Sequence, residues 1–184
     1  QVYGIFGSIQ NGLSTALLTV NTSATSSNFS AGTGIFANNL GAGNSIVSSL
    51  GVVNSTGAFG INSISQAGTQ TVTTGAGAVT ASGAGGIAIN NSATTGTINV
   101  ISGAGAVTGA VTGVQAASTG LQNITANGVI TGTSTSGISS NTTALRTITV
   151  GTAGNVTGGA QAVLLLGTGA ANIANGGIIG AAST

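Results

Sequence analysis

The sequence predicts an all-β protein, and three observations support this fold class. Val, Ile and Thr make up a third of the 184 residues, and β-branched side chains fit a pleated, half-buried surface better than a helix. The 34 glycines interrupt any long helical run, and the helix formers Glu, Lys and Met are absent. Short apolar runs recur at intervals of roughly ten residues with Gly, Asn and Ser between them, which is typical of a sandwich or barrel.

We expect an antiparallel β-sandwich, with a parallel β-helix as the alternative. The alternative is suggested by one internal repeat, because GAGAVT begins at Gly75 and again at Gly103. A solenoid is expected to show a sustained period, and one exact recurrence is not such a period. The strand order is not predicted, since many similar apolar runs leave the pairing ambiguous.

The first ten residues, QVYGIFGSIQ, are expected to form a separate strand that ends at the turn signal Asn11-Gly12. Alternation places one set of side chains on one face and a second set on the other. The first set is Tyr3, Ile5, Gly7 and Ile9, and the second includes Val2 and Phe6. The predicted organisation is therefore a strand at 1–10 and a single sandwich domain at 11–184.

Further strands are expected along the rest of the chain. LSTALLTV at 13–20 is followed by a polar loop, and the later strand candidates are IVSSLGVV, INSIS, TQTVTT, GIAIN, TINVI, LQNIT, GVITGT, LRTITV and AQAVLLL. AVLLL does not alternate, so we expect it to be buried on both faces. The core should consist of small aliphatic side chains, because the chain has only four Phe and one Tyr.

Charge is almost absent, and this argues against several function classes. Arg146, expected to face solvent on a strand, is the only charged residue, and there is no His or Cys. General acid–base catalysis then has only Tyr3 to use, and the Ser and Thr hydroxyls have no base to activate them. We expect no enzyme, no metal site, no cofactor and no nucleic-acid partner, since one Arg cannot neutralise a phosphate backbone.

The same composition suggests an acidic, extracellular setting. A chain without Asp, Glu, His or Lys gains no repelling charges in acid, and its stability depends little on pH. The chain begins at Gln1 and has no methionine, so we expect a cleaved secretory signal and a secreted, cell-surface location. No apolar stretch approaches the roughly 20 residues of a membrane helix.

One modification motif recurs, the N-x-[ST] acceptor of N-glycosylation. Neutral glycans would hydrate an uncharged surface and protect strand edges, a task that Lys or Pro often performs. The seven candidate sites are Asn21, Asn28, Asn54, Asn90, Asn123, Asn141 and Asn155.

The N-terminal strand suggests a structural polymer. An extended segment of one subunit can complete the sheet of the next, and head-to-tail addition that does not close gives a filament. The residues expected to make these contacts as a donor strand are Val2, Tyr3, Ile5, Phe6, Gly7 and Ile9. Alternatively, residues 1–10 are an ordinary edge strand of their own domain.

These features resemble the thread pilins of thermoacidophilic archaea: a secreted, almost uncharged β protein with many sequons and a detached N-terminal strand. The resemblance implies a pilin-like, immunoglobulin-like sandwich completed in trans by residues 1–10. It also implies N-glycosylation at the sequon asparagines and a helical homopolymer of identical subunits that serves adhesion or biofilm formation at the cell surface.

The alternative function is a monomeric β-helical adhesin or passenger-type binding domain. The Thr-x-Thr pairs in TQTVTT and TGTST also suggest a flat ice-binding face, although the pairs do not recur at a fixed interval.

Overall fold

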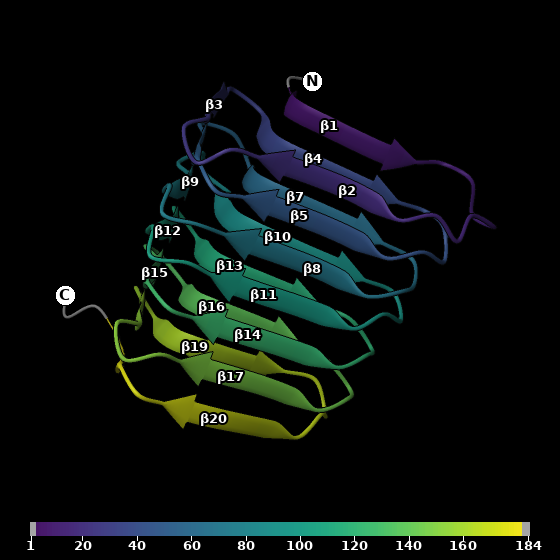
Figure 1. Cartoon of the computed structure of the whole chain (residues 1–184). Coiled ribbons are helices and arrows are strands. Elements are labelled where there is room, and N and C mark those ends of the chain that lie inside the picture. The colour runs from purple at the N-terminus through teal and green to yellow at the C-terminus, as the bar shows by residue number, and fades with distance from the viewer. Residues whose placement is uncertain (1–2, 182–184) are drawn as a thin grey trace.

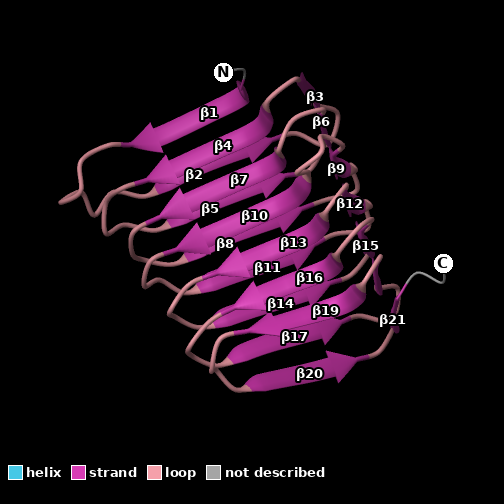
Figure 2. Cartoon of the chain, turned by 180° about the vertical axis from the view of Figure 1, so that it is seen from behind, coloured by secondary structure: helices cyan, strands magenta, loops and turns pink. Residues whose placement is uncertain are grey.

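The chain folds as a parallel β-solenoid of about seven coils (Figures 1 and 2). The computed structural model describes residues 3–181, and none of these residues lies in a helix. Each coil contributes one strand to each of three parallel, seven-stranded sheets. We refer to these as sheets A, B and C, in the order in which the chain meets them.

The strands are short and alternate with turns. Sheet A contains β1 (Tyr3–Ile9), β4 (Thr33–Asn39), β7 (Phe59–Ser65), β10 (Ile87–Ala93), β13 (Thr112–Ala117), β16 (Ser136–Asn141) and β19 (Gln161–Leu166). Sheet B contains β2 (Leu18–Thr22), β5 (Ser45–Ser49), β8 (Gln70–Thr74), β11 (Ile98–Ser102), β14 (Gln122–Ala126), β17 (Arg146–Val150) and β20 (Ala171–Asn175). Sheet C contains β3 (Ser27–Ser30), β6 (Val52–Ser55), β9 (Val79–Ala81), β12 (Val107–Gly109), β15 (Val129–Gly132), β18 (Asn155–Gly158) and β21 (Ile178–Ala181).

The antiparallel sandwich is not supported, and the β-helix alternative is the better description. Each strand pairs in parallel with the strand three places further along the chain, one coil away. The roughly ten-residue spacing of apolar runs therefore reflects three strands per coil and not hairpins. The coil length varies with the turns: 30 residues separate the partners Tyr3 and Thr33, but only 24 separate Thr112 and Ser136. This variation explains why the sequence shows no fixed period.

The repeated GAGAVT segment marks equivalent places in two successive coils. Its glycines lie in the turns that connect β8 to β9 and β11 to β12. The Gly105 backbone N–H donates to the Gly75 carbonyl at 3.0 Å. A Cβ atom on Gly103 would lie 2.4 Å from the Gly75 oxygen, so the stacked turns leave no space for a side chain there. The single exact recurrence is thus a true structural repeat of one coil.

Columns of small aliphatic side chains fill the interior, as the composition predicts. Register partners on successive strands place like residues above one another, and each sheet contributes one such column. Sheet A contributes Ile35, Ile61, Ile89, Val114 and Ile138; sheet B contributes Val47, Val72, Val100, Ile124 and Ile148; sheet C contributes Val53, Val79, Val107, Ile130 and Val156. All of these are almost fully buried and form one core between the three sheets.

The described part of the N-terminal strand lies in the sheet of its own chain. β1 pairs in parallel with β4 as an edge strand of sheet A, which agrees with the alternative of an edge strand in its own domain and not with a strand that stands apart. Ile5 packs on the core and Phe6 faces outward, as alternation predicts, but the Tyr3 ring stacks on Phe6 and Phe36. A Cβ on Gly7 would lie 2.8 Å from Val20, so its close approach is made within the chain.

Ile9 is a half-buried residue at the end of β1, whereas Val2 lies outside the described residues. The predicted polar loop after residue 20 contains strand β3, and no strand was predicted at β4, β9, β12, β13, β16 or β18. A search of the described residues found no helix long and apolar enough to cross a membrane.

Candidate functional site

The outer faces of the solenoid carry ladders of uncharged polar side chains. The Asn90 amide on sheet A donates to Asn62 Oδ1 at 2.8 Å, one coil away. On sheet B, the Asn123 amide donates to Asn99 Oδ1 at 3.0 Å. On sheet C, Thr80 donates to Asn54 Oδ1 at 2.9 Å. Without these hydrogen bonds the side chains would bond to water. The bonds therefore fix the orientation of part of the polar side chains on each outer face.

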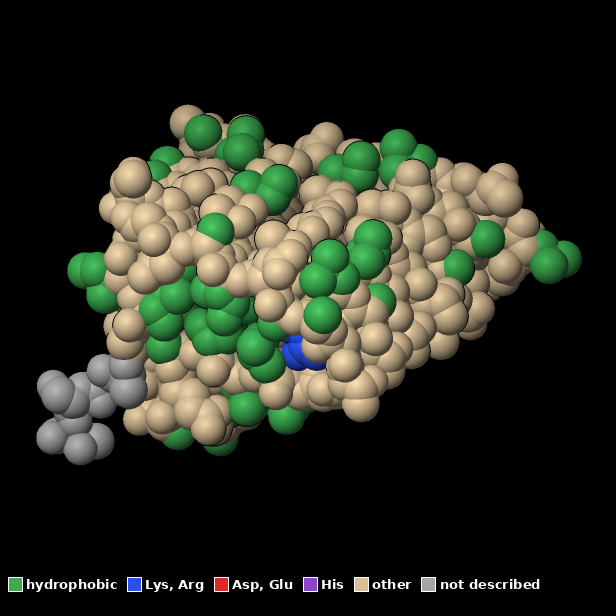
Figure 3. All heavy atoms as spheres, turned by 90° about the horizontal axis from the view of Figure 1, so that it is seen from below, with side chains coloured by type: hydrophobic (Ala, Val, Ile, Leu, Met, Phe, Trp, Pro, Cys, Tyr) green, Lys and Arg blue, Asp and Glu red, His purple; other side chains and the backbone are tan. Residues whose placement is uncertain are grey.

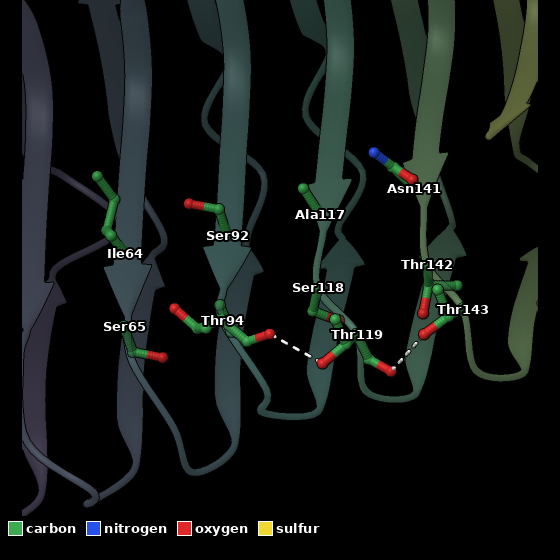
Figure 4. A pocket seen from close by; sticks show the side chains of 11 residues that line it. Ile64, Ser65, Ser92, Thr94, Ala117, Ser118, Thr119, Asn141, Thr142 and Thr143 are labelled. Carbon is green, nitrogen blue, oxygen red and sulfur yellow. Dashed lines mark hydrogen bonds between the residues drawn. The ribbon is translucent and has the colours of Figure 1, made fainter. Parts of the chain in front are cut away.

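A groove crosses four of these coils at the turns that connect sheet A to sheet B (Figure 4). We call it the hydroxyl groove. It has a volume of about 410 Å³ and runs over the ends of β7, β10, β13 and β16. Its lining consists of Ile64, Ser65, Ser92, Ala93, Thr94, Ala117, Ser118, Thr119, Asn141, Thr142 and Thr143.

Threonines in successive turns form a ladder along the groove. Thr119 donates to the Thr94 carbonyl from both its backbone N–H (3.3 Å) and its hydroxyl (2.9 Å). The Thr143 hydroxyl donates to the Thr119 carbonyl at 3.4 Å (Figure 4). Each donating hydroxyl keeps its lone pairs, so the ladder presents acceptors at the coil spacing of about 4.8 Å.

One polar atom at the groove has no partner. Ser65 is 3% exposed, and its hydroxyl makes no hydrogen bond among the described residues. A buried hydroxyl without a partner costs free energy, of the order of 1–3 kcal/mol. Ser65 lies beside Ile64, the largest apolar side chain of the lining. The groove therefore combines an apolar wall, a row of hydroxyls and one unsatisfied group.

Arg146 supports the groove from inside, and its predicted exposure is wrong. It is 1% exposed, and it donates to the carbonyls of Ser140 (2.9 Å), Thr142 (3.1 Å) and Gly169 (3.1 Å). Alternation in β17 explains this position, because Arg146 lies on the same face as buried Ile148. The guanidinium thus ties together the turns of two coils at one end of the groove.

The residue one coil before Arg146 in the same strand column has a similar role. This register partner, Gln122, donates to the Asn141 carbonyl at 2.7 Å and accepts a hydrogen bond from the Ser140 hydroxyl at 2.5 Å. These buried polar residues hold turn carbonyls in place from below. They were not predicted from the sequence, because Gln and Arg inside a strand are more often on the solvent face.

The seven sequon asparagines are spread over all three sheets and differ in accessibility. Asn21, Asn123 and Asn141 are exposed, and Asn54, Asn90 and Asn155 are half-buried. Asn28 is 9% exposed, and its amide donates to the Gly34 carbonyl at 3.0 Å. A glycan on Asn28 would require this hydrogen bond to break, whereas a glycan on Asn141 would enter the hydroxyl groove.

The two Thr-x-Thr pairs do not share a face. Thr71 and Thr73 lie on the outer face of sheet B in β8, whereas Thr131 belongs to β15 of sheet C. Thr133 and Thr135 follow β15 in the turn back to sheet A. The flat face of paired threonines suggested by the sequence is therefore not assembled from these segments.

The hydroxyl groove can bind a ligand only through uncharged hydrogen-bonding groups and apolar contacts. Hydroxyls, amides and backbone carbonyls line the groove, and none of its lining residues is ionisable. Within residues 3–181, no group of three or more His, Cys, Asp or Glu could hold a metal ion. Such an arrangement can bind a neutral, hydroxyl-rich ligand, with orientation fixed by the repeated donors and acceptors.

The fold defines the class of this protein as a parallel β-solenoid. Comparisons with protein-family models, with curated proteins and with solved structures found no match.

Proposed function

We propose that this chain is an adhesin-like binding domain whose hydroxyl groove holds a neutral polysaccharide along the solenoid axis. One observation carries the proposal: hydrogen-bonding groups from four successive coils line a single groove. A polysaccharide repeats its hydroxyls along its length, so a groove with a regular repeat can contact several sugar units at once. Several weak contacts on one chain add up to useful affinity.

The lack of charge supports a neutral ligand. A cationic or anionic polymer is usually bound by side chains of opposite sign, and the groove lining has none. Arg146 lies beneath the groove, but three carbonyls already accept its hydrogen bonds. The apolar wall at Ile64 and Ala93 would lie against the C–H faces of the sugar rings.

This reading favours the β-helical adhesin over the donor-strand pilin, because β1 is already paired in its own sheet. Secretion, N-glycosylation and a cell-surface location remain proposals, motivated by the sequons and by the uncharged composition. Deleting residues 1–10 tests the donor-strand alternative: that alternative predicts loss of polymer, whereas an intrachain edge strand predicts a less stable solenoid.

The binding proposal is tested with insoluble cellulose, chitin and starch as probes. We expect the chain to be retained on at least one of them, with retention unchanged by about 1 M NaCl, since there is no ionic contact to screen. Thr119→Lys should reduce retention by about tenfold, because a long cation fills the groove and must be desolvated. The matched control is Thr125→Lys, on the outer face of sheet B.

Two outcomes would count against the proposal. Retention on none of the three polysaccharides would remove its ligand class. Equal loss of retention in Thr119→Lys and Thr125→Lys would mean that the hydroxyl groove is not the binding surface. Glycan occupancy at Asn141 is measured in parallel by peptide mass spectrometry, since a glycan attached there would itself occupy the groove.

A further inference from the structure

The C-terminal coil is apolar where the preceding coils are polar. β16 carries Ser139, Ser140 and Asn141, and their register partners on β19 are Leu164, Leu165 and Leu166. The sequence predicts that this apolar run is buried on both faces, yet Leu165 is 38% and Leu166 is 44% exposed.

The other two sheets show the same exposure at this end. Ile173 on β20 is 48% exposed and Ile178 on β21 is 60% exposed. Figure 3 views the molecule from the end that carries β20, and apolar side chains gather there beside Arg146, the only blue side chain. A large exposed apolar patch on a protein surface is typical of an interaction site.

The two ends of the solenoid have matching architectures. Among the described residues, β1, β2 and β3 begin the three sheets and β19, β20 and β21 end them, so each has a neighbour on one side only. Edge strands present unpaired backbone donors and acceptors in the spacing that another parallel strand requires. All the pairings inside the molecule are parallel, so the first coil of a second copy can continue the last coil of the first.

The side chains at the two ends are complementary in size when the internal register is continued. The column that ends in Leu165 begins with Gly7, the column that ends in Ala171 begins with Leu18, and the column that ends in Gly180 begins with Phe29. In each of these three columns a large side chain would meet a small one, so neither side chain obstructs the contact.

The aliphatic columns of the core also continue across such a junction. Val163 would meet Ile5 in sheet A, and Ile173 would meet Val20 in sheet B. On the outer face of sheet A, Leu164 would meet Phe6. The contact would thus repeat the one already made between neighbouring coils of the chain.

We propose that the C-terminal coil binds the N-terminal coil of a second copy of this chain, end to end. The interface is heterologous, since different surfaces meet, and it does not close on itself. Repeated addition therefore gives a filament of stacked solenoids, with an axial repeat of about 34 Å for seven coils spaced about 4.8 Å apart. This assembly uses the edges of all three sheets and does not depend on the polysaccharide proposal.

Disulfide trapping tests the proposal, because the chain has no cysteine of its own. Ser8 begins the outward column of sheet A that ends in Leu166. Across the junction their Cα atoms would lie about 4.8 Å apart, within the range of a disulfide. Ser8→Cys and Leu166→Cys are purified separately, mixed and oxidised. The matched control replaces Ser8→Cys by Gln115→Cys, which lies on the same face in the middle of the molecule.

We expect the Ser8→Cys and Leu166→Cys pair to cross-link about tenfold more than the control pair, because docking raises the local thiol concentration to the millimolar range. Equal cross-linking of both pairs would overturn the proposal. So would a predominance of disulfides between two Ser8→Cys chains or between two Leu166→Cys chains, which would indicate a closed, symmetric dimer.

Sedimentation velocity of the unmodified chain tests end-to-end docking independently of the cysteine variants. End-to-end docking predicts elongated species that grow with concentration, and Leu165→Asp should abolish them while circular dichroism keeps its β signal. A monomer at every concentration would overturn the proposal and would leave the apolar end to a different partner or to another segment.

Discussion

The central coils and the last coil share one backbone plan but differ in what they present to solvent. In β16 the apolar Ile138 is buried and Asn141 is exposed, so an aliphatic interior is separated from a polar outside. In β19 the run Leu164–Leu166 is apolar on both faces. Backbone pairing thus sets the fold in every coil, while the outward positions decide what each coil contacts. Polar positions in the middle form a groove, and apolar positions at the end form a docking surface.

The largest expected effect contrasts the core with the open end. Ile89→Asp places an unpaired carboxylate at a fully buried site and should cost about 4 kcal/mol of unfolding free energy or more. Ile173→Asp, at the half-exposed end, should cost about 1 kcal/mol in dilute solution, since its carboxylate reaches water. Urea denaturation followed by circular dichroism measures both values. Similar losses for the two variants would contradict the distinction between the regions.

The second prediction concerns the buried cation at the junction of the two regions. Arg146→Ala removes the guanidinium donors from three carbonyls, of which Thr142 keeps only its bond from the Gly169 backbone N–H, and should cost about 2–4 kcal/mol. Arg146→Gln should recover about half of this loss, because Gln122 holds turn carbonyls from the same column. An unchanged urea midpoint for Arg146→Ala would show that the guanidinium does not support these turns.

The third prediction compares two glycines. A Cβ on Gly113 would lie 2.7 Å from both the Gly137 oxygen and Ile130 Cγ2, whereas a Cβ on Gly180 meets no atom within 4 Å. Gly113→Ala should therefore cost about 1–3 kcal/mol through overpacking between sheets A and C. Gly180→Ala should lie within about 0.5 kcal/mol of the parent. Thermal unfolding of the pair checks this, and a stabilised Gly113→Ala variant would argue against close packing there.

The smallest expected effect is that of pH. Stability changes with pH only where the folded and unfolded states bind different numbers of protons. The side chains that titrate between about pH 3 and about pH 8 are Asp, Glu, His and, near the upper limit, Cys, and the chain has none of them. The urea midpoint should accordingly stay constant across this range for both regions. A fall in acid would remove the basis for an acidic setting.

The all-β class and the strands with longer apolar runs could be predicted, because β-branched runs such as TQTVTT and LRTITV become β8 and β17. The parallel winding could not, since turns of unequal length remove the sequence period that would reveal it. Its one visible trace was GAGAVT at Gly75 and Gly103, which lie in equivalent turns.

The site was beyond prediction for a related reason. Thr94, Thr119 and Thr143 are far apart in sequence and become neighbours only when the length of each coil is known. The burial of Arg146 was within reach, because it shares the alternation of Ile148 and Val150. The alternation was not followed because a buried cation without an acidic partner is uncommon in proteins.

Hydrogen exchange of the full chain, followed by mass spectrometry at two protein concentrations, tests the central comparison most directly. We expect β10 and β13 to be strongly protected at both concentrations, because each pairs with a neighbour on both edges. β19 and β20 should exchange faster in dilute solution and become protected at high concentration, when their open edges meet a second copy. Equal protection of these strands in dilute solution, or unprotected β10 and β13, would contradict the account.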